Sequence, residues 1–244
     1  MPELNERVPR LALLIDADNS NPARLADLLA EIAKYGNASV RRAYGNWTSG
    51  HLGGWKAGLL SHSIQPIQQF NYTTGKNATD SAMIIDAMDL LYAGHLDGYC
   101  IVSSDSDFTR LAARIREQGL TVYGFGERKT PQAFVAACDK FIYTENLGDE
   151  TSAKPKPAST SKLKRDAKLD ALLAEAIDAA SDDEGWAHLG AVGSNLQRLA
   201  SDFDTRSYGF AKLKDLIAAH PGYAMEARKG GDGRSNMHYV REKG

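Results

Sequence analysis

Cysteine is scarce in this chain: Cys100 and Cys138 are the only two among 244 residues, and both lie in apolar runs. Such a chain has neither a disulfide framework nor a cysteine-rich zinc site. Long hydrophobic runs are also missing, since no stretch of about 18 apolar residues, the length that spans a bilayer, occurs. Residues 1–7 lack the basic-then-apolar order of a signal peptide. We therefore expect a soluble cytoplasmic protein without a membrane partner.

Neither sign of charge dominates. The chain has 29 basic and 31 acidic residues and a formal net charge of −2, which argues against a protein that coats nucleic acid indiscriminately. A metal-dependent nuclease is still compatible, because its bound cations restore a local positive potential. Zinc motifs such as HExxH and a glycine-rich phosphate-binding loop are both absent from the sequence. Zinc hydrolysis and histidine-based ribonuclease chemistry are therefore unsupported.

Two domains are expected from the length and the 43% hydrophobic content. Between them, residues 154–168 interleave proline and serine with six basic residues and the single acid Asp166. This composition is typical of a solvated, flexible linker. We predict a domain over residues 1–148, a basic linker over 149–168 and a second domain over 169–244.

Apolar runs alternate with amphipathic segments in the first domain. The predicted strands are 11–16, 39–44, 64–70, 99–103 and 120–125. The predicted helices are 23–35, 55–62, 79–93, 108–118 and a short one from residue 132. This alternation predicts an α/β fold in which helices cover both faces of a parallel sheet.

Four aspartates follow two of the predicted strands. Asp16 and Asp18 come directly after the apolar run 11–15, and Asp105 and Asp107 come shortly after residue 102. Ligands in open α/β sheets bind outside the carboxyl ends of the strands, so we expect both pairs to face one crevice. Crowded carboxylates raise one another's pKa unless a cation lies among them. Oxygen ligands alone suit Mg²⁺ or Mn²⁺.

A further acid, Asp80, lies in the first turn of the predicted helix 79–93. At about 100° per residue it shares a stripe with Ile84, Ala87 and Leu91, whereas Asp86 points away from that stripe. The helix dipole also favours an acid in the first turn, which leaves open a role as a simple N-terminal helix acid. Because the stripe faces the sheet, we assign Asp80 to the metal site and leave Asp86 outside it.

Three blocks of the sequence resemble the signature blocks of the NYN family of PIN-like nucleases. They are Leu13–Asn19, Lys76–Asp80 and Val102–Phe108, and the likeness extends over about residues 9–147. The resemblance implies a PIN-like parallel sheet sandwiched by helices and a metal-dependent ribonuclease activity. The catalytic and metal-binding roles it implies fall on Asp16, Asp80, Asp105 and Asp107, with Asn19, Asp18 and Ser103 in supporting positions.

Two residues of this domain are candidates for RNA contacts. Lys76, just before Asp80, is placed to contact a phosphate, although a loop lysine is usually only solvated. Trp47 precedes the glycine-rich stretch 50–54 and is a candidate for stacking on unpaired bases. Trp55, on the other side of that stretch, is expected to pack in the core.

The chain beyond the linker has the pattern of a winged helix, with three helical segments followed by two strand-like segments around a glycine-rich turn. Residues 185–193 and 203–210 resemble the OST-HTH or LOTUS domain, and the likeness covers about residues 168–242. The resemblance implies binding of single-stranded or structured RNA, or docking of a protein partner. Because the domain also holds many acids, RNA must contact a local basic patch, for which we predict Lys212, Lys214, Arg228, Lys229 and Arg234.

The leading hypothesis is an endoribonuclease that cleaves RNA through an aspartate-held Mg²⁺ or Mn²⁺ site, with the C-terminal domain recruiting RNA. One alternative is a haloacid-dehalogenase-like phosphohydrolase, because Ile15–Asp18 is similar to the strand that carries the aspartyl nucleophile of that class. That class has a hairpin flap after this motif, whereas Pro22 here predicts the start of a helix. A second alternative is a non-catalytic RNA-binding or regulatory adaptor that keeps the carboxylates as a structural metal site.

Overall fold

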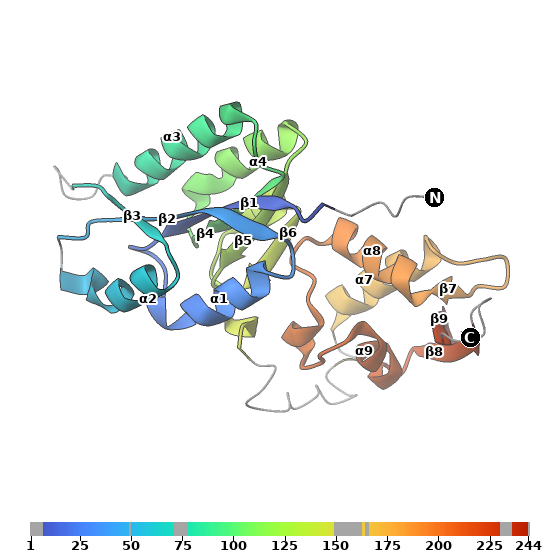
Figure 1. The fold of residues 1–244 in the computed structure, drawn as a ribbon. Coiled ribbons are helices and arrows are strands. Elements are labelled where there is room, and N and C mark those ends of the chain that lie inside the picture. Colours follow the sequence, from blue (N-terminus) through green and yellow to red (C-terminus); the bar gives the residue numbers. More distant parts are fainter. Residues whose placement is uncertain are drawn as a thin grey trace. The chain divides into compact units, whose positions relative to one another are not determined.

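The computed structural model describes residues 7–48, 50–70, 78–148, 163, 166–229 and 236–243. The chain divides into two compact units, residues 1–148 and residues 149–244. Figure 1 shows the sheet and helices of the first unit in blue to yellow, and the smaller second unit in orange to red. Each unit is described by itself.

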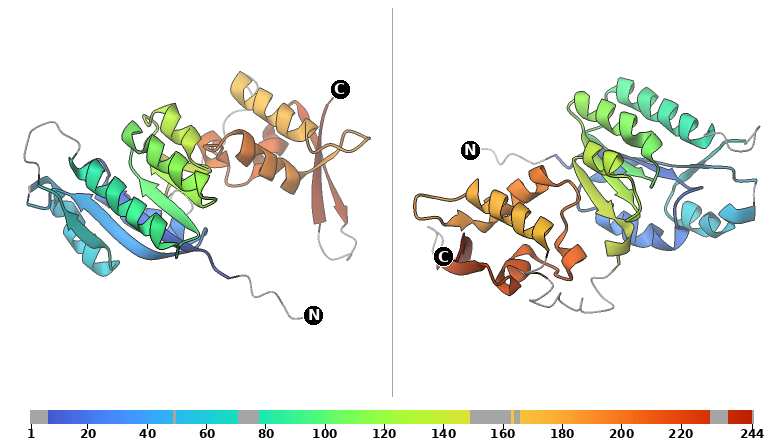
Figure 2. Two further views of the ribbon diagram at one scale, coloured as in Figure 1. Left: turned by 90° about the horizontal axis from the view of Figure 1, so that it is seen from above. Right: turned by 180° about the vertical axis from the view of Figure 1, so that it is seen from behind.

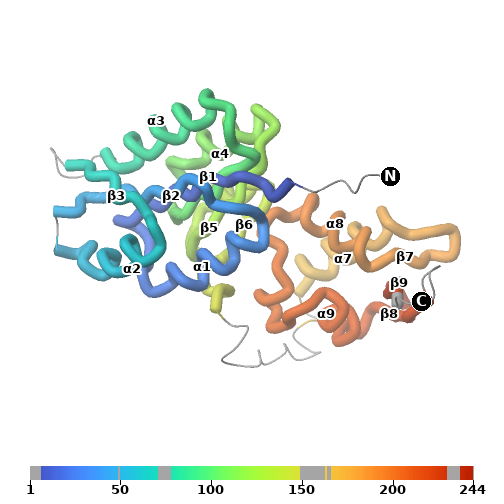
Figure 3. Tube along the Cα trace, in the orientation of Figure 1, coloured from blue at the N-terminus to red at the C-terminus, as the bar shows by residue number. Residues whose placement is uncertain are grey.

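A six-stranded sheet forms the centre of the first unit. Its strand order is β3-β2-β1-β4-β5-β6, and every neighbouring pair is parallel. The strands are β1 (Arg10–Asp16), β2 (Asn37–Gly45), β3 (Gln65–Gln68), β4 (Gly98–Val102), β5 (Thr121–Gly126) and β6 (Lys140–Tyr143). The chain moves from β1 outward to β3, then crosses back to β4, so the strand order reverses between β1 and β4 (Figure 3). In sheets of this kind the point of reversal is where ligands bind.

Helices cover both faces of the sheet, as the alternating sequence pattern predicted. The helical segments of this unit are η1 (Pro22–Arg24), α1 (Leu25–Ile32), η2 (Gly50–Trp55), α2 (Lys56–Ser61), α3 (Ala78–Ala93), η3 (Ser106–Phe108), α4 (Thr109–Glu117), α5 (Gln132–Ala137) and η4 (Thr144–Asn146). Figures 1 and 2 show α1 and α2 on one side of the sheet and α3 and α4 on the other.

The central strand β1 is buried on both faces. Leu13 packs into the hydrophobic cluster on the α1 side, and Leu14 packs into the cluster on the α3 side. Both side chains are 0% exposed. Because the strand is covered on both faces, the side chains of its run 11–15 are apolar throughout and do not alternate between apolar and polar. The first charged side chain after this run, Asp16, therefore comes at the carboxyl end of the sheet.

Some elements differ from the predicted ones. The helix predicted over residues 23–35 starts as the 3-10 turn η1 and is regular only from Leu25 to Ile32. The edge strand β6 was not predicted, because its four residues carry too little periodicity to distinguish a strand from a loop. Parallel pairing with β5, which depends on the tertiary fold, defines this strand.

The second unit is a small helical domain closed by an antiparallel sheet of order β7-β9-β8, the arrangement of a winged helix. Its elements are α7 (Ala167–Asp178), β7 (Ala187–His188), α8 (Leu189–Leu199), η5 (Thr205–Tyr208), α9 (Leu213–Ala219), β8 (Tyr223–Lys229) and β9 (Asn236–Glu242). Leu173, Leu196, Leu216 and Val240 lie in its core, each 0% exposed. Within the described residues, no helix of the chain combines the length and hydropathy needed to cross a bilayer.

Candidate functional site

Three aspartates converge at the carboxyl end of the sheet. One carboxylate oxygen each from Asp80, Asp105 and Asp107 lies within 4.8 Å of the other two. Asp80 comes from the first turn of α3, and the other two come from the turn after β4. Asp105 caps η3, because its Oδ1 accepts a hydrogen bond of 2.9 Å from the backbone N–H of Asp107. Local capping and the placement of α3 therefore bring together acids that are 25 residues apart in the sequence.

Asp16 lies at the end of β1 and is 0% exposed, but it is not a member of this three-residue cluster. Its Oδ2 accepts hydrogen bonds from Ser103 Oγ at 2.8 Å and from Asn19 Nδ2 at 3.0 Å. Its Oδ1 accepts a third from the backbone N–H of Asn19 at 3.3 Å. The hydroxyl of Ser103 also accepts from the backbone N–H of Asp105 at 3.1 Å. Ser103 thus joins the ends of β1 and β4 and fixes the orientation of the Asp16 carboxylate.

Burial and like charge raise the pKa values of the two most enclosed acids. The pKa of Asp80 rises from 3.8 to about 6, first because of burial and then because of the charges of Asp16, Asp105, Asp107 and Asp18. The pKa of Asp16 is also raised, mainly by burial, although the hydrogen bonds from Ser103 and Asn19 act in the opposite direction. The site therefore concentrates negative charge where deprotonation is costly.

The side chains fit a hard divalent cation. Within the described part of the chain, no lysine or arginine forms an ion pair with Asp80 or Asp105. A cation bound among the carboxylates would compensate their negative charge. Its donor set would be oxygen alone, which matches the ligand preference of Mg²⁺ and Mn²⁺ and leaves soft metals without a thiolate or imidazole ligand.

Asp18 lies beside the cluster, but its carboxylate contacts Thr79 and His51. Its Oδ2 accepts a hydrogen bond of 3.0 Å from Thr79 Oγ1, which connects the end of β1 to the start of α3. Its Oδ1 lies 3.1 Å from His51 Nε2 in η2. The sequence did not point to His51, because 33 residues separate it from Asp18 and no metal-binding histidine motif surrounds it.

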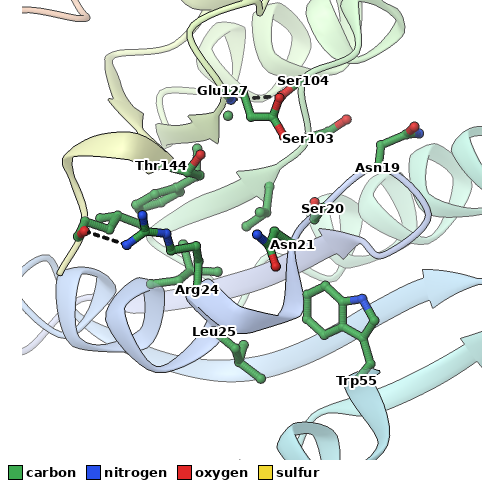
Figure 4. Close-up of a pocket in the computed structure, with 15 residues that line it drawn as sticks. Asn19, Ser20, Asn21, Arg24, Leu25, Trp55, Ser103, Ser104, Glu127 and Thr144 are labelled. Carbon is green, nitrogen blue, oxygen red and sulfur yellow. Dashed lines mark hydrogen bonds between the residues drawn. The ribbon is translucent and has the colours of Figure 1, made fainter. Parts of the chain in front are cut away.

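An open groove of about 370 Å³ runs beside the acidic cluster. It is lined by Asp18, Asn19, Ser20, Asn21, Ser104, Asp105, Glu127 and Lys129. Five of these residues also line a smaller neighbouring cavity, and Figure 4 shows them together with Arg24 and Trp55. Lys129, which the sequence analysis did not single out, brings a positive charge to the groove and pairs with Glu127 at 2.8 Å. The polar lining does not suit an apolar ligand, and its three carboxylates would admit a polyanionic strand only once a cation is bound.

Asp86 lies outside the cluster, where the sequence analysis left it. Its carboxylate accepts hydrogen bonds from Arg42 Nη1 and from the hydroxyl of Tyr44, both on β2. Trp47 is half-buried against the core, and its Nε1 donates a hydrogen bond of 3.0 Å to the carbonyl oxygen of Ile67. Stacking of Trp47 on RNA bases stays a prediction.

The basic residues predicted to contact RNA are distributed over the second unit. Lys212 is exposed at the start of α9, and Lys214, two residues later in the first turn, is half-exposed. Arg228 and Lys229 end β8. Lys76 and Arg234, which complete the predicted set, lie outside the described residues.

Comparisons with known proteins identify both units. The family model of the NYN domain matches residues 10–147, and that of the OST-HTH/LOTUS domain matches residues 161–235. No curated protein matches the chain.

Three solved structures are similar to parts of the chain. A protein of unknown function from Vibrio parahaemolyticus is 17% identical, with a TM-score of 0.49, over 57% of this chain and 94% of that chain. An uncharacterized protein from Nitrosomonas europaea is 35% identical over 39% of this chain and 91% of that chain, with a TM-score of 0.30. A protein from Chromobacterium violaceum is 28% identical over 30% of this chain and 78% of that chain, with a TM-score of 0.26.

The NYN match spans more than half of the chain and includes the ends of β1 and β4 as well as the start of α3. An NYN domain implies a PIN-like nuclease fold, in agreement with the parallel sheet and the acidic cluster. An OST-HTH/LOTUS domain implies RNA binding. The chain therefore belongs to the NYN domain family, and its NYN domain is followed by an OST-HTH/LOTUS domain.

Proposed function

We propose that this protein is an endoribonuclease that depends on Mg²⁺ or Mn²⁺, and that its C-terminal domain recruits the RNA. The observation that carries the proposal is the convergence of Asp80, Asp105 and Asp107 beside an open polar groove. In this proposal Asp16 belongs to the same catalytic centre, because its negative charge acts directly on Asp80.

Each group of the site has a distinct part in the proposed reaction. A bound divalent cation would supply an activated water and would neutralise the charge that develops on the phosphodiester. The three clustered carboxylates would hold it, and Ser103 would keep the Asp16 carboxylate in place through its 2.8 Å hydrogen bond. The groove would orient the strand, and Lys129 would contact a phosphate by exchanging its ion pair with Glu127 for one with the RNA. Orientation of this kind lowers the barrier by removing the entropy cost of alignment.

The other two functions have less support. The haloacid-dehalogenase-like alternative needs a hairpin flap after the first motif, whereas the described chain enters η1 at Pro22 only six residues after Asp16. The adaptor alternative would use the carboxylates as a structural metal site and the groove for RNA binding, and the absence of RNA cleavage in the presence of metal would favour it. We also infer a cytoplasmic location from the two buried free thiols, which suit a reducing compartment.

The proposal is tested by incubating the purified chain with single-stranded and hairpin RNA in Mg²⁺, Mn²⁺ or EDTA. We expect internal cleavage in the presence of metal, no cleavage in EDTA, and no cleavage by Asp16→Asn. As a matched control, Asp89→Asn removes an exposed carboxylate of α3 and should leave the rate unchanged. Hydrolysis of p-nitrophenyl phosphate without RNA cleavage would support the phosphohydrolase instead.

A further inference from the structure

The sheet of the C-terminal domain has one buried and one outward face. Met225 on β8 and Val240 on β9 are paired and pack toward the hydrophobic core. Side chains alternate along a strand, so their neighbours lie on the opposite face. The register places there the pairs Glu226 with Tyr239, Arg228 with Met237 and Ala224 with Arg241. The outward face is therefore rich in arginine and aromatic side chains.

These side chains contact one another as rings and guanidinium planes. The guanidinium carbon of Arg228 lies 4.4 Å from the ring centroid of Tyr239 and 5.3 Å from that of Trp186. The guanidinium carbon of Arg241 lies 4.6 Å from the same Trp186 ring. His188 meets Tyr239 edge to face, with the ring centroids 5.4 Å apart. We call Trp186, Arg228, Tyr239 and Arg241 the arginine–aromatic face.

The charges on this face are only partly compensated. Arg228 Nε donates to the carboxylate of Glu226, which balances one guanidinium. Arg241 is exposed, and within the described residues it forms no ion pair with a carboxylate. Two guanidinium groups therefore gather around one indole, with Glu226 paired to Arg228 and Asp182 close enough to act on the charge of Arg228. A cation–π contact at an exposed site is weak and leaves the guanidinium N–H groups of Arg241 free to donate to a phosphate, so charge complementarity favours a polyanion as the partner.

We propose that the arginine–aromatic face binds unpaired bases of an RNA strand by stacking, and that Arg241 contacts the neighbouring phosphate. This inference rests on the proposed function, in which the C-terminal domain recruits RNA, and it names the surface of that domain that binds the RNA. Single-stranded RNA is read by stacking bases on aromatic rings and on arginine planes, and the face presents both. It shares Arg228 with the basic patch predicted from the sequence, whereas Trp186, Tyr239 and Arg241 are not among the predicted contacts.

The test measures binding in EDTA, so that cleavage does not interfere. The intact chain is titrated into a fluorescently labelled 12-nucleotide uridine RNA and, separately, into an abasic strand with the same number of phosphates. Tyr239→Ala should weaken binding of the uridine strand by about 5- to 100-fold and leave the abasic strand unaffected, given the usual strength of stacking on one aromatic residue. Tyr239→Phe, which keeps the ring, should bind as the unmodified chain does.

Arginine variants separate stacking from charge. Arg241→Lys keeps the charge but loses the guanidinium fork that donates two hydrogen bonds to a phosphate, so we expect about fivefold weaker binding of both strands. Arg198→Lys, an exposed arginine on α8 of the same domain, is the matched control and should have no effect. Circular dichroism establishes that each variant is folded.

The outcomes distinguish this inference from the proposed function. If the unmodified chain binds neither strand, RNA recruitment and this inference both fail. If it binds the uridine strand and Tyr239→Ala and Arg241→Lys bind equally well, only the inference fails. If sedimentation shows self-association that Tyr239→Ala abolishes while RNA binding is unchanged, the face is a contact between copies of the chain, and the inference is overturned.

Discussion

The two units each gather like charges, but of opposite sign. In the NYN domain, Asp80, Asp105 and Asp107 bring carboxylate oxygens within 4.8 Å of one another. In the C-terminal domain, Arg228 and Arg241 lie over the same Trp186 ring. A cluster of carboxylates repels RNA unless a cation is bound, whereas a cluster of guanidinium groups attracts RNA directly. The difference predicts that cleavage requires metal and that RNA binding by the C-terminal domain does not.

The largest expected effect comes from removing one carboxylate of the cluster. Asp105→Asn should lower the rate of RNA cleavage in Mg²⁺ by about 10³-fold or more, because the charge that stabilises the developing transition state is lost with the metal. Affinity for RNA in EDTA should stay within about twofold. Cleavage gels and binding titrations on the same preparation check both. A parallel loss of RNA binding would show that cleavage and RNA binding are not separated between the two domains.

The second effect is on stability and depends on pH. The folded-state pKa of Asp80 is raised from 3.8 to about 6, so ionising this carboxyl costs more in the folded protein than in the unfolded chain. Its contribution to stability is complete below about pH 4 and is lost as the pH rises through about 6. In EDTA at pH 7.5, Asp80→Asn should therefore raise the free energy of unfolding by about 2–3 kcal/mol.

Urea unfolding at a series of pH values checks this prediction. The difference between Asp80→Asn and the unmodified chain should be small at pH 4, grow through pH 6 and then level off. Saturating Mg²⁺ should reduce or reverse it, because the metal stabilises the ionised carboxylates. A difference that does not change with pH would contradict the charged environment of Asp80. No such dependence is expected for Arg241→Gln, since guanidinium groups stay charged over this range.

A smaller effect is expected from Ser103, which holds Asp16 without joining the acidic cluster. Ser103→Ala should weaken metal binding by about 10- to 100-fold, as the loss of supporting hydrogen bonds typically does. Calorimetric titration with Mn²⁺ measures the affinity. Ser39→Ala, which removes an exposed hydroxyl of β2, is the matched control and should leave the affinity unchanged. Equal metal affinity of the two variants would remove the structural role assigned to Ser103.

The smallest effect concerns the lysines of the C-terminal domain. Each phosphate contact on a single strand contributes about −0.7 to the slope of log affinity against log salt. Lys212→Gln combined with Lys229→Gln should flatten that slope by up to about 1.4 and change affinity only a few-fold at a fixed salt concentration. Binding titrations between 50 and 200 mM salt, roughly the range in which such slopes are measured, test it. An unchanged slope would leave the arginine–aromatic face as the principal RNA-binding surface.

Much of the fold was predictable from local pattern. The run that became β1 is apolar throughout because the strand is covered on both faces, and such runs bounded by turn residues predict parallel strands. Helical periodicity placed Asp80 on a buried stripe of α3 with Ile84, Ala87 and Leu91. The structure buries Asp80, Ala87 and Leu91, whereas Ile84 is half-buried and its neighbour Met83 is buried. The edge strand β6 and the two-residue strand β7 were missed, because only pairing with distant strands defines them.

The site was also predictable only in part, because sequence patterns report local structure and not contacts between distant segments. Strand ends pointed to Asp16, Asp18, Asp105 and Asp107, and the helical stripe pointed to Asp80. Of these five, Asp80, Asp105 and Asp107 form the cluster, and the metal-binding role of all five stays a prediction. Contacts that depend on loop packing were not accessible, and the pairing of His51 with Asp18 is one of them. The arginine–aromatic face was missed because it combines residues of β8 and β9 with Trp186, which precedes β7.

The central claim is that the carboxylate cluster binds the cation on which RNA cleavage depends. The most direct measurement follows bound Mn²⁺ by electron paramagnetic resonance and RNA cleavage by gel in the same titration. The account predicts that both rise with the same midpoint and that Asp105→Asn loses both. Cleavage in EDTA, or full Mn²⁺ binding and full cleavage by Asp105→Asn, would contradict it.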